Sequence, residues 1–144
     1  MARLTDRAGS SAYFAGGVVA YADRIKTGQL SVPPTLLATR GAVSREAARA
    51  MAEGVRRRLA VEVGLAVTGI AGPGGAVPGK PVGTVWFGLS LPTRFLEEKV
   101  EFDGDRTRVR ALAVEHALRL LVRVLEGEPP GPDQDRTQAS SPGR

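Results

Sequence analysis

Apolar residues recur at helical spacing in two long stretches of the chain. In residues 105–126 the apolar side chains stand three or four positions apart: Val109, Leu112, Ala113, Ala117, Leu120, Leu121 and Val124. This spacing predicts an amphipathic helix that ends at Gly127. Residues 44–59 show the same periodicity after Ser44, a candidate N-cap. Both stretches are therefore predicted to be amphipathic helices.

Shorter helices are predicted in the first third of the chain. Asp23 is a candidate cap for a helix that ends near Leu30, and Pro33-Pro34 opens another that closes at Gly41. The first eight residues resemble the last turns of a helix whose beginning is absent. Ser10 or Ser11 is a candidate cap for the turn that follows.

Four segments have the length and composition of strands. Residues 16–21 and 61–68 are mostly apolar, which is typical of strands covered on both faces, and residues 82–91 form a further strand. Residues 96–102 are more polar and are expected nearer an edge of the sheet. Strands and helices in this order predict an α/β fold, a three-layer α/β/α sandwich with a mixed β-sheet.

The composition changes abruptly after Gly127. Residues 128–144 contain four prolines and no large apolar side chain, so burial cannot offset the entropy lost on ordering. We expect one folded domain over residues 1–127 and a disordered tail over 128–144. A chain of 144 residues is long enough for one such core.

The composition excludes several kinds of site. The chain has no cysteine and one histidine, His116, so thiolate metal sites and disulfides are excluded and no metal or cofactor is expected. His116 falls on the apolar stripe of the last predicted helix and is expected to be packed there. No apolar run approaches the roughly 18 residues that span a bilayer, and the N-terminus has no long apolar segment of the kind found in signal peptides, so a cytoplasmic protein without membrane contact is expected.

The charge is +5 at neutral pH, with seventeen arginines and three lysines. These arginines are scattered, and the one cluster, Arg56-Arg57-Arg58, stands at the end of a predicted helix, where the dipole favours cations. Nucleic acid is therefore not an expected partner. The sequence leaves open whether the chain forms a homo-oligomer.

Three residues near the N-terminus could form a covalent hydrolase site. Ser11, Tyr21 and Lys26 supply a hydroxyl, a phenol and an amine within sixteen positions. A serine nucleophile with a lysine base is an alternative to the Ser-His-Asp triad. Each residue also has an ordinary structural interpretation. Ser11 could cap a turn, Tyr21 could be a half-buried strand residue, and Lys26 could be a solvated helix side chain.

A Gly-rich loop after residue 68 resembles a phosphate-binding loop. Residues 74–81 spell G-x-x-x-x-G-K-P, but the last position lacks the hydroxyl that binds magnesium, and a strand follows instead of a helix. A P-loop nucleotidase is therefore not expected. The glycines would let the backbone approach a ligand, or simply permit a tight turn.

Six motifs of this chain resemble, in the same order, those of the C-terminal domain of the CinA (competence/damage-inducible) family. They are Gly9-Ser10-Ser11-Ala12-Tyr13-Phe14, Tyr21 with Lys26, Gly41-Ala42-Val43-Ser44, Thr68-Gly69-Ile70-Ala71-Gly72-Pro73, Lys80-Pro81-Val82-Gly83-Thr84 and Gly104-Asp105-Arg106. Stand-alone forms of that domain are nicotinamide-nucleotide amidohydrolases. The resemblance therefore implies hydrolysis of the carboxamide of nicotinamide mononucleotide to nicotinate mononucleotide and ammonia, without a metal.

The resemblance also implies roles for individual residues. Ser11 would be the nucleophile and Lys26 the general base, with Tyr21 orienting the pair. The remaining implied residues would contact the substrate: Thr68, Gly69, Gly72 and Arg106. As a base, Lys26 must lose its proton at the working pH, which requires desolvation or a nearby positive charge.

Two departures separate the chain from the family pattern. Ala22-Asp23 replaces the usual Ser-Asn after the site tyrosine, which changes the polar surroundings of Lys26. The sequence also begins after the family's first strand and its Thr-Ala-Glu-Ser-Cys-Thr-Gly-Gly turn, so we expect a gap or an exposed edge in the sheet. A catalytically inactive nucleotide-binding or interaction domain of the same family is the alternative function.

Overall fold

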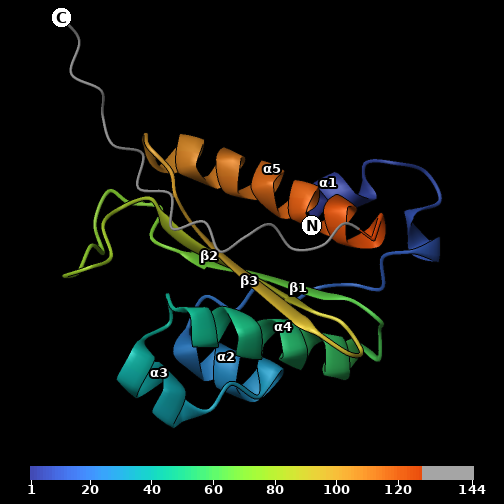
Figure 1. The fold of residues 1–144 in the computed structure, drawn as a ribbon, viewed down its shortest axis with the longest axis horizontal. Helices are drawn as coiled ribbons and strands as arrows, with labels where there is room; N and C mark the ends of the chain where they lie inside the picture. The colour runs from blue at the N-terminus through green and yellow to red at the C-terminus, as the bar shows by residue number, and fades with distance from the viewer. Residues whose placement is uncertain (128–144) are drawn as a thin grey trace, which may run out of the picture.

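The computed structural model describes residues 1–127, which form a sheet between two layers of helices (Figure 1). The sheet has three strands in the order β1-β2-β3: β1 (Gly64–Gly69), β2 (Thr84–Ser90) and β3 (Phe95–Glu101). One layer holds α5 (Arg106–Leu125) and the short α1 (Ala2–Thr5), and the other holds α2 (Asp23–Leu30), α3 (Pro34–Arg40) and α4 (Arg45–Leu59). The α/β sandwich predicted from the sequence is confirmed. The tail predicted for 128–144 lies outside the described residues.

The two long helices follow the predicted patterns closely. Ser44 caps α4, because its hydroxyl oxygen accepts a hydrogen bond from the backbone N–H of Ala47 at 3.1 Å. Asp105 caps α5 in the same way through the N–H of Arg108, at 2.8 Å. The bounds of α2, α3, α4 and α5 agree with the predicted segments to within about a residue. Asp23 is the first residue of α2 and not its cap.

Two apolar cores lie on opposite faces of the sheet. The first joins β2 to α5 and is built from Val85, Phe87, Leu89, Leu96, Val109, Ala113, Ala117, Leu120 and Val124. The second joins α4 to α2, α3 and β1 and includes Val32, Leu37, Met51, Ala52 and Ala66. Successive side chains of β2 point to opposite faces of the sheet. The odd-numbered ones therefore fill the first core, and the even-numbered ones face α4.

The sheet of the described residues is antiparallel throughout, whereas a mixed sheet was predicted. In the register, Thr68 lies opposite Trp86 and Leu89 opposite Leu96. The predicted strand over 16–21 is wrong: this segment has no strand assignment and no backbone hydrogen bonds to a neighbour. It keeps a strand-like alternation, since Val18 and Ala20 pack on the second core while Val19 and Tyr21 are exposed. The segment therefore has the side-chain alternation of a strand without the backbone hydrogen bonds to a neighbour that define one.

Two further expectations differ from the structure. The 3-10 turn η1 (Ser10–Ala12) begins after Gly9 and has no side-chain cap, so neither serine caps it. Within the described residues, β1 has one neighbouring strand, β2, and its other edge is unpaired. On β1, Val67 is 41% exposed. This agrees with the expected exposed edge of the sheet, and it means that β1 is not covered on both faces along its whole length.

Candidate functional site

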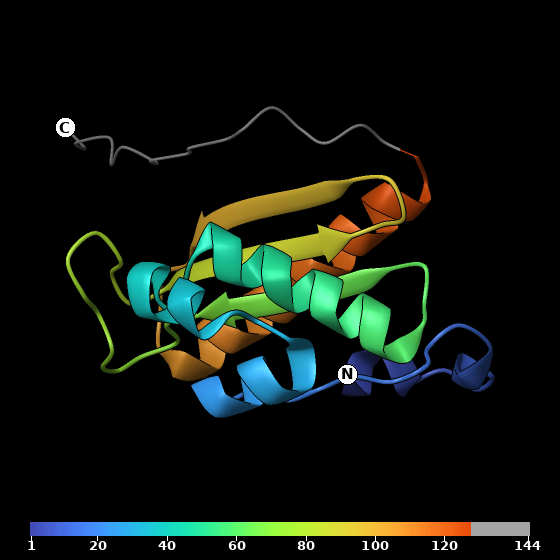
Figure 2. The ribbon, with the colours of Figure 1, turned by 90° about the horizontal axis from the view of Figure 1, so that it is seen from below.

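Most of the candidate residues gather at one end of the sandwich. The end of β1, the Gly-rich loop after it, and the first residues of α2, α4 and α5 all lie there in both ribbon views (Figures 1 and 2). Thr68, Gly69, Gly72, Lys26 and Arg106 belong to these segments. The fold thus brings together residues that lie up to eighty positions apart in the sequence.

Lys26 is a buried amine with two oxygen partners. Its side chain lies in the first two turns of α2, and the residue is 6% exposed. Nζ lies 3.0 Å from Oδ1 of Asp23 and donates to the backbone carbonyl of Tyr21 at 3.2 Å. Lysine is seldom buried without a partner, and Asp23 supplies the compensating charge. From the sequence, Asp23 is only a candidate cap and a departure from the family pattern.

Tyr21 contributes its backbone, and not its phenol, to the surroundings of Lys26. Its side chain is 84% exposed, while its carbonyl oxygen accepts from Nζ. A phenol that orients the lysine or relays a proton is therefore absent from this arrangement. A hollow beside Asp23, lined also by Thr27 and Leu37, opens between α2 and α3.

Thr68 connects the end of β1 to the loop before α4. The residue is 8% exposed, and its hydroxyl donates to the carbonyl oxygen of Ala42 at 2.7 Å. A hydroxyl has one proton, so this bond leaves the oxygen of Thr68 able only to accept. Thr68 can therefore receive an amide N–H but cannot donate to an oxyanion while the bond to Ala42 persists.

Gly69 and Gly72 are each required by close packing. A Cβ on Gly69 would stand 2.7 Å from a methyl of Val85, and one on Gly72 would stand 2.7 Å from a methyl of Val82. Gly72 also has a φ of 85°, in the left-handed region that glycine tolerates best. Both glycines thus have a structural reason to be present, beside the substrate contact that the family resemblance implies.

Arg106 attaches the Gly-rich loop to the last helix. It is the first residue of α5, and one of its terminal nitrogens donates to the carbonyl oxygen of Gly72 at 3.0 Å. The guanidinium has further N–H groups, which leaves donors for an anion.

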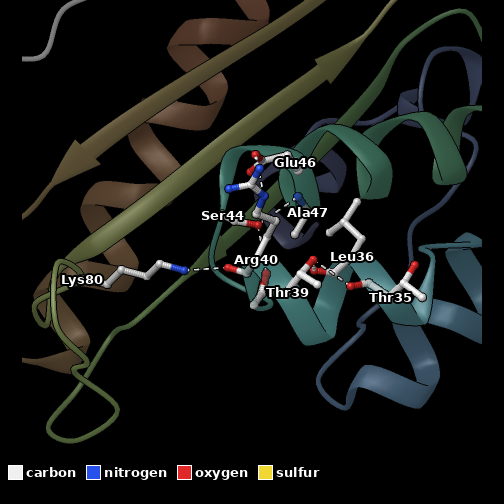
Figure 3. A network of polar contacts seen from close by, with 9 residues as sticks. Thr35, Leu36, Thr39, Arg40, Ser44, Glu46, Ala47 and Lys80 are labelled. Carbon is white, nitrogen blue, oxygen red and sulfur yellow. Dashed lines mark hydrogen bonds and ion pairs between the residues drawn. The ribbon is translucent and has the colours of Figure 1, made fainter.

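Lys80 attaches the same loop to the opposite helical layer. Its Nζ donates to the carbonyl oxygen of Arg40 at 2.8 Å, at the end of α3 (Figure 3). Beside it, Ser44 donates to the carbonyl of Gly41 at 2.9 Å, and Arg40 pairs with Glu46. The sequence places Lys80 in the Gly-rich loop and in one of the family motifs without a role of its own, and its rarity among many arginines is a further signal.

Thr84 is a buried hydroxyl that the sequence analysis did not select as a site residue. It is fully buried at the start of β2, and Oγ1 has no hydrogen-bond partner, which distinguishes it from the other buried side chains of residues 1–127. The sequence feature that could have identified Thr84 is its position directly after Gly83, at the start of an apolar strand.

Ser11 lies apart from this group. It is an exposed residue of η1, at the opposite end of the sandwich from the start of α2 (Figures 1 and 2). The segment between them is largely extended, and each residue of extended chain spans roughly 3.3 Å. The structure therefore does not bring the hydroxyl of Ser11 to the amine of Lys26.

Two kinds of feature are absent from residues 1–127. None of the helices described there is long and apolar enough to cross a membrane. No group of three or more histidine, cysteine, aspartate or glutamate side chains in that range could hold a metal ion.

The chain resembles known proteins over nearly all of its described length. A family model described as the CinA C-terminal domain matches residues 1–125. A CinA-like protein from Mycolicibacterium gilvum is 50% identical over 127 residues, which are 88% of this chain and 30% of that protein. A putative competence-damage inducible protein from Desulforamulus reducens is 49% identical over 127 residues, 88% of this chain and 31% of that protein. The chain thus spans about a third of the length of these curated relatives.

Solved structures share the fold. The competence/damage inducible protein CihA from Agrobacterium tumefaciens has 39% sequence identity and a TM-score of 0.83, covering 86% of this chain and 76% of that one. The competence damage-inducible protein A from Klebsiella pneumoniae has 34% identity and a TM-score of 0.83, covering 87% and 78%.

Proposed function

The chain belongs to the CinA C-terminal domain family, and from this premise we propose that it hydrolyses the carboxamide of nicotinamide mononucleotide to nicotinate mononucleotide and ammonia. The observation that carries the proposal is the buried amine of Lys26, at the end of the sandwich where the Gly-rich loop and Arg106 also lie. The order of the six sequence motifs supports it as well.

The proposed chemistry is a two-step acyl transfer through a serine. The hydroxyl oxygen attacks the carboxamide carbon while Lys26 takes the hydroxyl proton, and the amine then returns that proton to the departing ammonia. Water next attacks the acyl-enzyme ester, and the acid and the free serine are released. No oxidant, reductant or metal takes part.

Lys26 must be neutral to act as the base. The amine of Lys26 is buried, and the carboxylate of Asp23 lies 3.0 Å from its Nζ. Arg106 and Lys80 flank the Gly-rich loop and supply positive charge for the substrate phosphate. Thr68 has an oxygen free to accept the amide N–H of the substrate.

Ser11 is the proposed nucleophile, and this role requires a movement. Residues 14–21 must leave their extended path for Ser11 to reach Lys26, because the two residues lie at opposite ends of that segment. The segment has no backbone ladder to break, which lowers the cost of such a movement.

A second candidate function is nucleotide binding without catalysis. The separation of Ser11 from Lys26 favours it, and so does the ion pair between Lys26 and Asp23. In this alternative Lys26 and Arg106 would serve as cationic contacts for the nucleotide.

Ammonia release from nicotinamide mononucleotide, with calorimetric binding of the same compound, tests both functions. The enzyme is expected to release ammonia in the presence of EDTA and to lose this activity in Lys26→Ala and Lys26→Arg alike, since arginine keeps its proton throughout the working pH range. Ser11→Ala should be inactive and Ser10→Ala nearly unchanged. Binding without ammonia release in the wild type would select the alternative function, and the absence of both would reject the two together.

A further inference from the structure

The buried hydroxyl of Thr84 has no partner among the described residues, although the backbone of the same residue is fully bonded. Its N–H donates to the carbonyl oxygen of Pro81 at 3.1 Å, and its carbonyl oxygen accepts from the N–H of Ile70 at 2.9 Å. Oγ1 alone is left without a hydrogen bond, in a residue with no exposed surface. A buried polar group of this kind costs stability, and a ligand that bonds to it is one physical reason for its presence.

A part of the Gly-rich loop packs beside this hydroxyl. We call residues 73–80 the strap, and residues 73–79 of it are all exposed to solvent. A Cβ on Gly75 would stand 3.4 Å from a methyl of Ile70, the residue directly opposite Thr84 on the neighbouring strand. The strap therefore lies against the same face of the sheet as Thr84, toward α4.

One side-chain hydrogen bond holds the far end of the strap. The backbone groups of Val77 and Lys80 bond to each other, so they tie the strap to itself and to no other element. Nζ of Lys80 donates to the carbonyl oxygen of Arg40 at 2.8 Å (Figure 3), and among the described residues this is the hydrogen bond that joins the strap to another element. The contact is exposed, so a hydrogen bond to water can replace it at low cost.

Thr68 and Thr84 together match the two ends of a carboxamide. The hydroxyl proton of Thr68 is committed to the carbonyl of Ala42, so its oxygen can only accept, whereas the hydroxyl of Thr84 is free to donate. The two residues are diagonal neighbours on one face of an antiparallel pair, where side chains stand roughly 7 Å apart. An amide with one hydrogen bond of about 2.9 Å at each end covers a similar distance.

We propose that the strap opens at the contact between Lys80 and Arg40 and admits the substrate carboxamide to the hydroxyl of Thr84. This inference rests on the proposed function. Thr84 donates a hydrogen bond to the carbonyl oxygen, and that bond strengthens as the serine attacks and the oxygen gains negative charge. Thr84 keeps its proton throughout, and the oxygen of Thr68 receives the amide N–H. The hydroxyl of Thr84 is unpaired in the structure because its partner arrives with the substrate.

Cysteine labelling tests the opening of the strap, because the chain has no native cysteine. N-ethylmaleimide should modify Thr84→Cys slowly, and about tenfold or more faster when Lys80→Met removes the amine that holds the strap. Lys99→Met is the matched control, since it removes another lysine, on β3, and should leave the labelling rate unchanged. Equal rates with and without Lys80→Met would overturn the opening at Lys80.

Ser90→Cys separates a local opening from unfolding of the whole domain. Ser90 is also fully buried and lies on the same face of β2, at the other end of the strand. Its labelling should not respond to Lys80→Met. Equal acceleration of Ser90→Cys and Thr84→Cys would overturn the proposal, because the whole domain would then be opening.

Ammonia release from nicotinamide mononucleotide tests the role of Thr84 itself. Thr84→Val should lower kcat/KM about a hundredfold without lowering the melting temperature, and Thr84→Ser, which keeps the hydroxyl, should retain most of the rate. A merely structural role would lower the melting temperature together with the rate. Thr84→Val as active as the wild type would overturn the role of Thr84 alone. A wild type that releases no ammonia would reject the proposed function and the carboxamide contact with it, and the labelling rates decide the opening in either case.

Discussion

Thr68 and Thr84 lie on the same face of neighbouring strands, and only Thr68 has a hydrogen-bond partner. Thr68 is opposite Trp86 in the register, and Thr84 stands two residues before Trp86 on β2. Both are buried toward α4, but Thr68 donates to the carbonyl of Ala42 while Oγ1 of Thr84 bonds to no other described residue. The two hydroxyls therefore have opposite consequences for stability.

Replacing each threonine by the isosteric valine should change stability in opposite directions. Thr68→Val leaves the carbonyl of Ala42 without its donor, so the free energy of unfolding should fall by about 1 kcal/mol. Thr84→Val removes a buried hydroxyl without a partner and should raise it by a similar amount, about 1 kcal/mol. Urea unfolding of the two variants measures both changes. A loss of stability in Thr84→Val would mean that its hydroxyl has a partner in solution, such as a water.

Two helical glycines should respond oppositely to alanine. A Cβ on Gly54 of α4 would stand 1.9 Å from the carbonyl oxygen of Leu30, so Gly54→Ala should separate α4 from α2 and destabilise the fold by about 3 kcal/mol. A Cβ on Gly28 of α2 meets nothing within 4 Å, so Gly28→Ala should stabilise by about 1 kcal/mol through helix propensity. Thermal unfolding compares the pair. Equal melting temperatures would contradict the close crossing of the two helices.

The stability of the domain should depend on Glu98 at acidic pH. A hydrogen bond from His116, whose Nε2 lies 2.9 Å from the carboxylate, and the pairing with Arg123 lower the pKa of Glu98 below its ordinary 4.5, although burial acts in the opposite direction. A lowered pKa stabilises the folded state above the ordinary value, and this contribution is lost as the pH falls through the folded-state pKa.

Glu98→Gln isolates this contribution. The variant should lose stability at neutral pH and show a shallower fall in unfolding free energy between about pH 5 and pH 2 than the wild type. Glu62→Gln, an exposed glutamate, is the control and should follow the wild-type curve. Parallel curves for Glu98→Gln and the wild type would remove Glu98 as the titrating group.

Asp23→Asn should separate catalysis from stability at the candidate site. Removing the carboxylate releases Nζ of Lys26 from its ion pair, so ammonia release from nicotinamide mononucleotide should increase several-fold if Lys26 is the base. The same change leaves a buried ammonium without its ion pair, so the melting temperature should fall. Asp103→Asn, at an exposed loop position, should change neither quantity. A lower rate in Asp23→Asn would argue that Lys26 works as a cation.

The sequence alone determined the local elements of this protein, together with its family motifs. The side chains of Ser44 and Asp105 cap the starts of α4 and α5 by accepting hydrogen bonds from backbone N–H groups three residues later. The spacing of apolar residues indicates the buried face of each helix. These features depend on contacts within three or four residues, so a linear pattern records them. The motif that contains Tyr21 and Lys26 indicates Lys26 as a site residue but does not indicate its burial.

Only the tertiary structure decided which of these segments meet. Residues 16–21 have the composition and alternation of a strand, but a strand also needs a neighbour's backbone, and no pattern within the segment supplies one. The exposed phenol of Tyr21, the burial of Lys26 and the distant position of Ser11 follow from that missing pairing and from where the helices pack. Likewise Arg106 meets Gly72 across 34 positions because α5 begins beside the Gly-rich loop. Such contacts join residues that share no local periodicity, and packing of the two helical layers on the sheet is what fixes them.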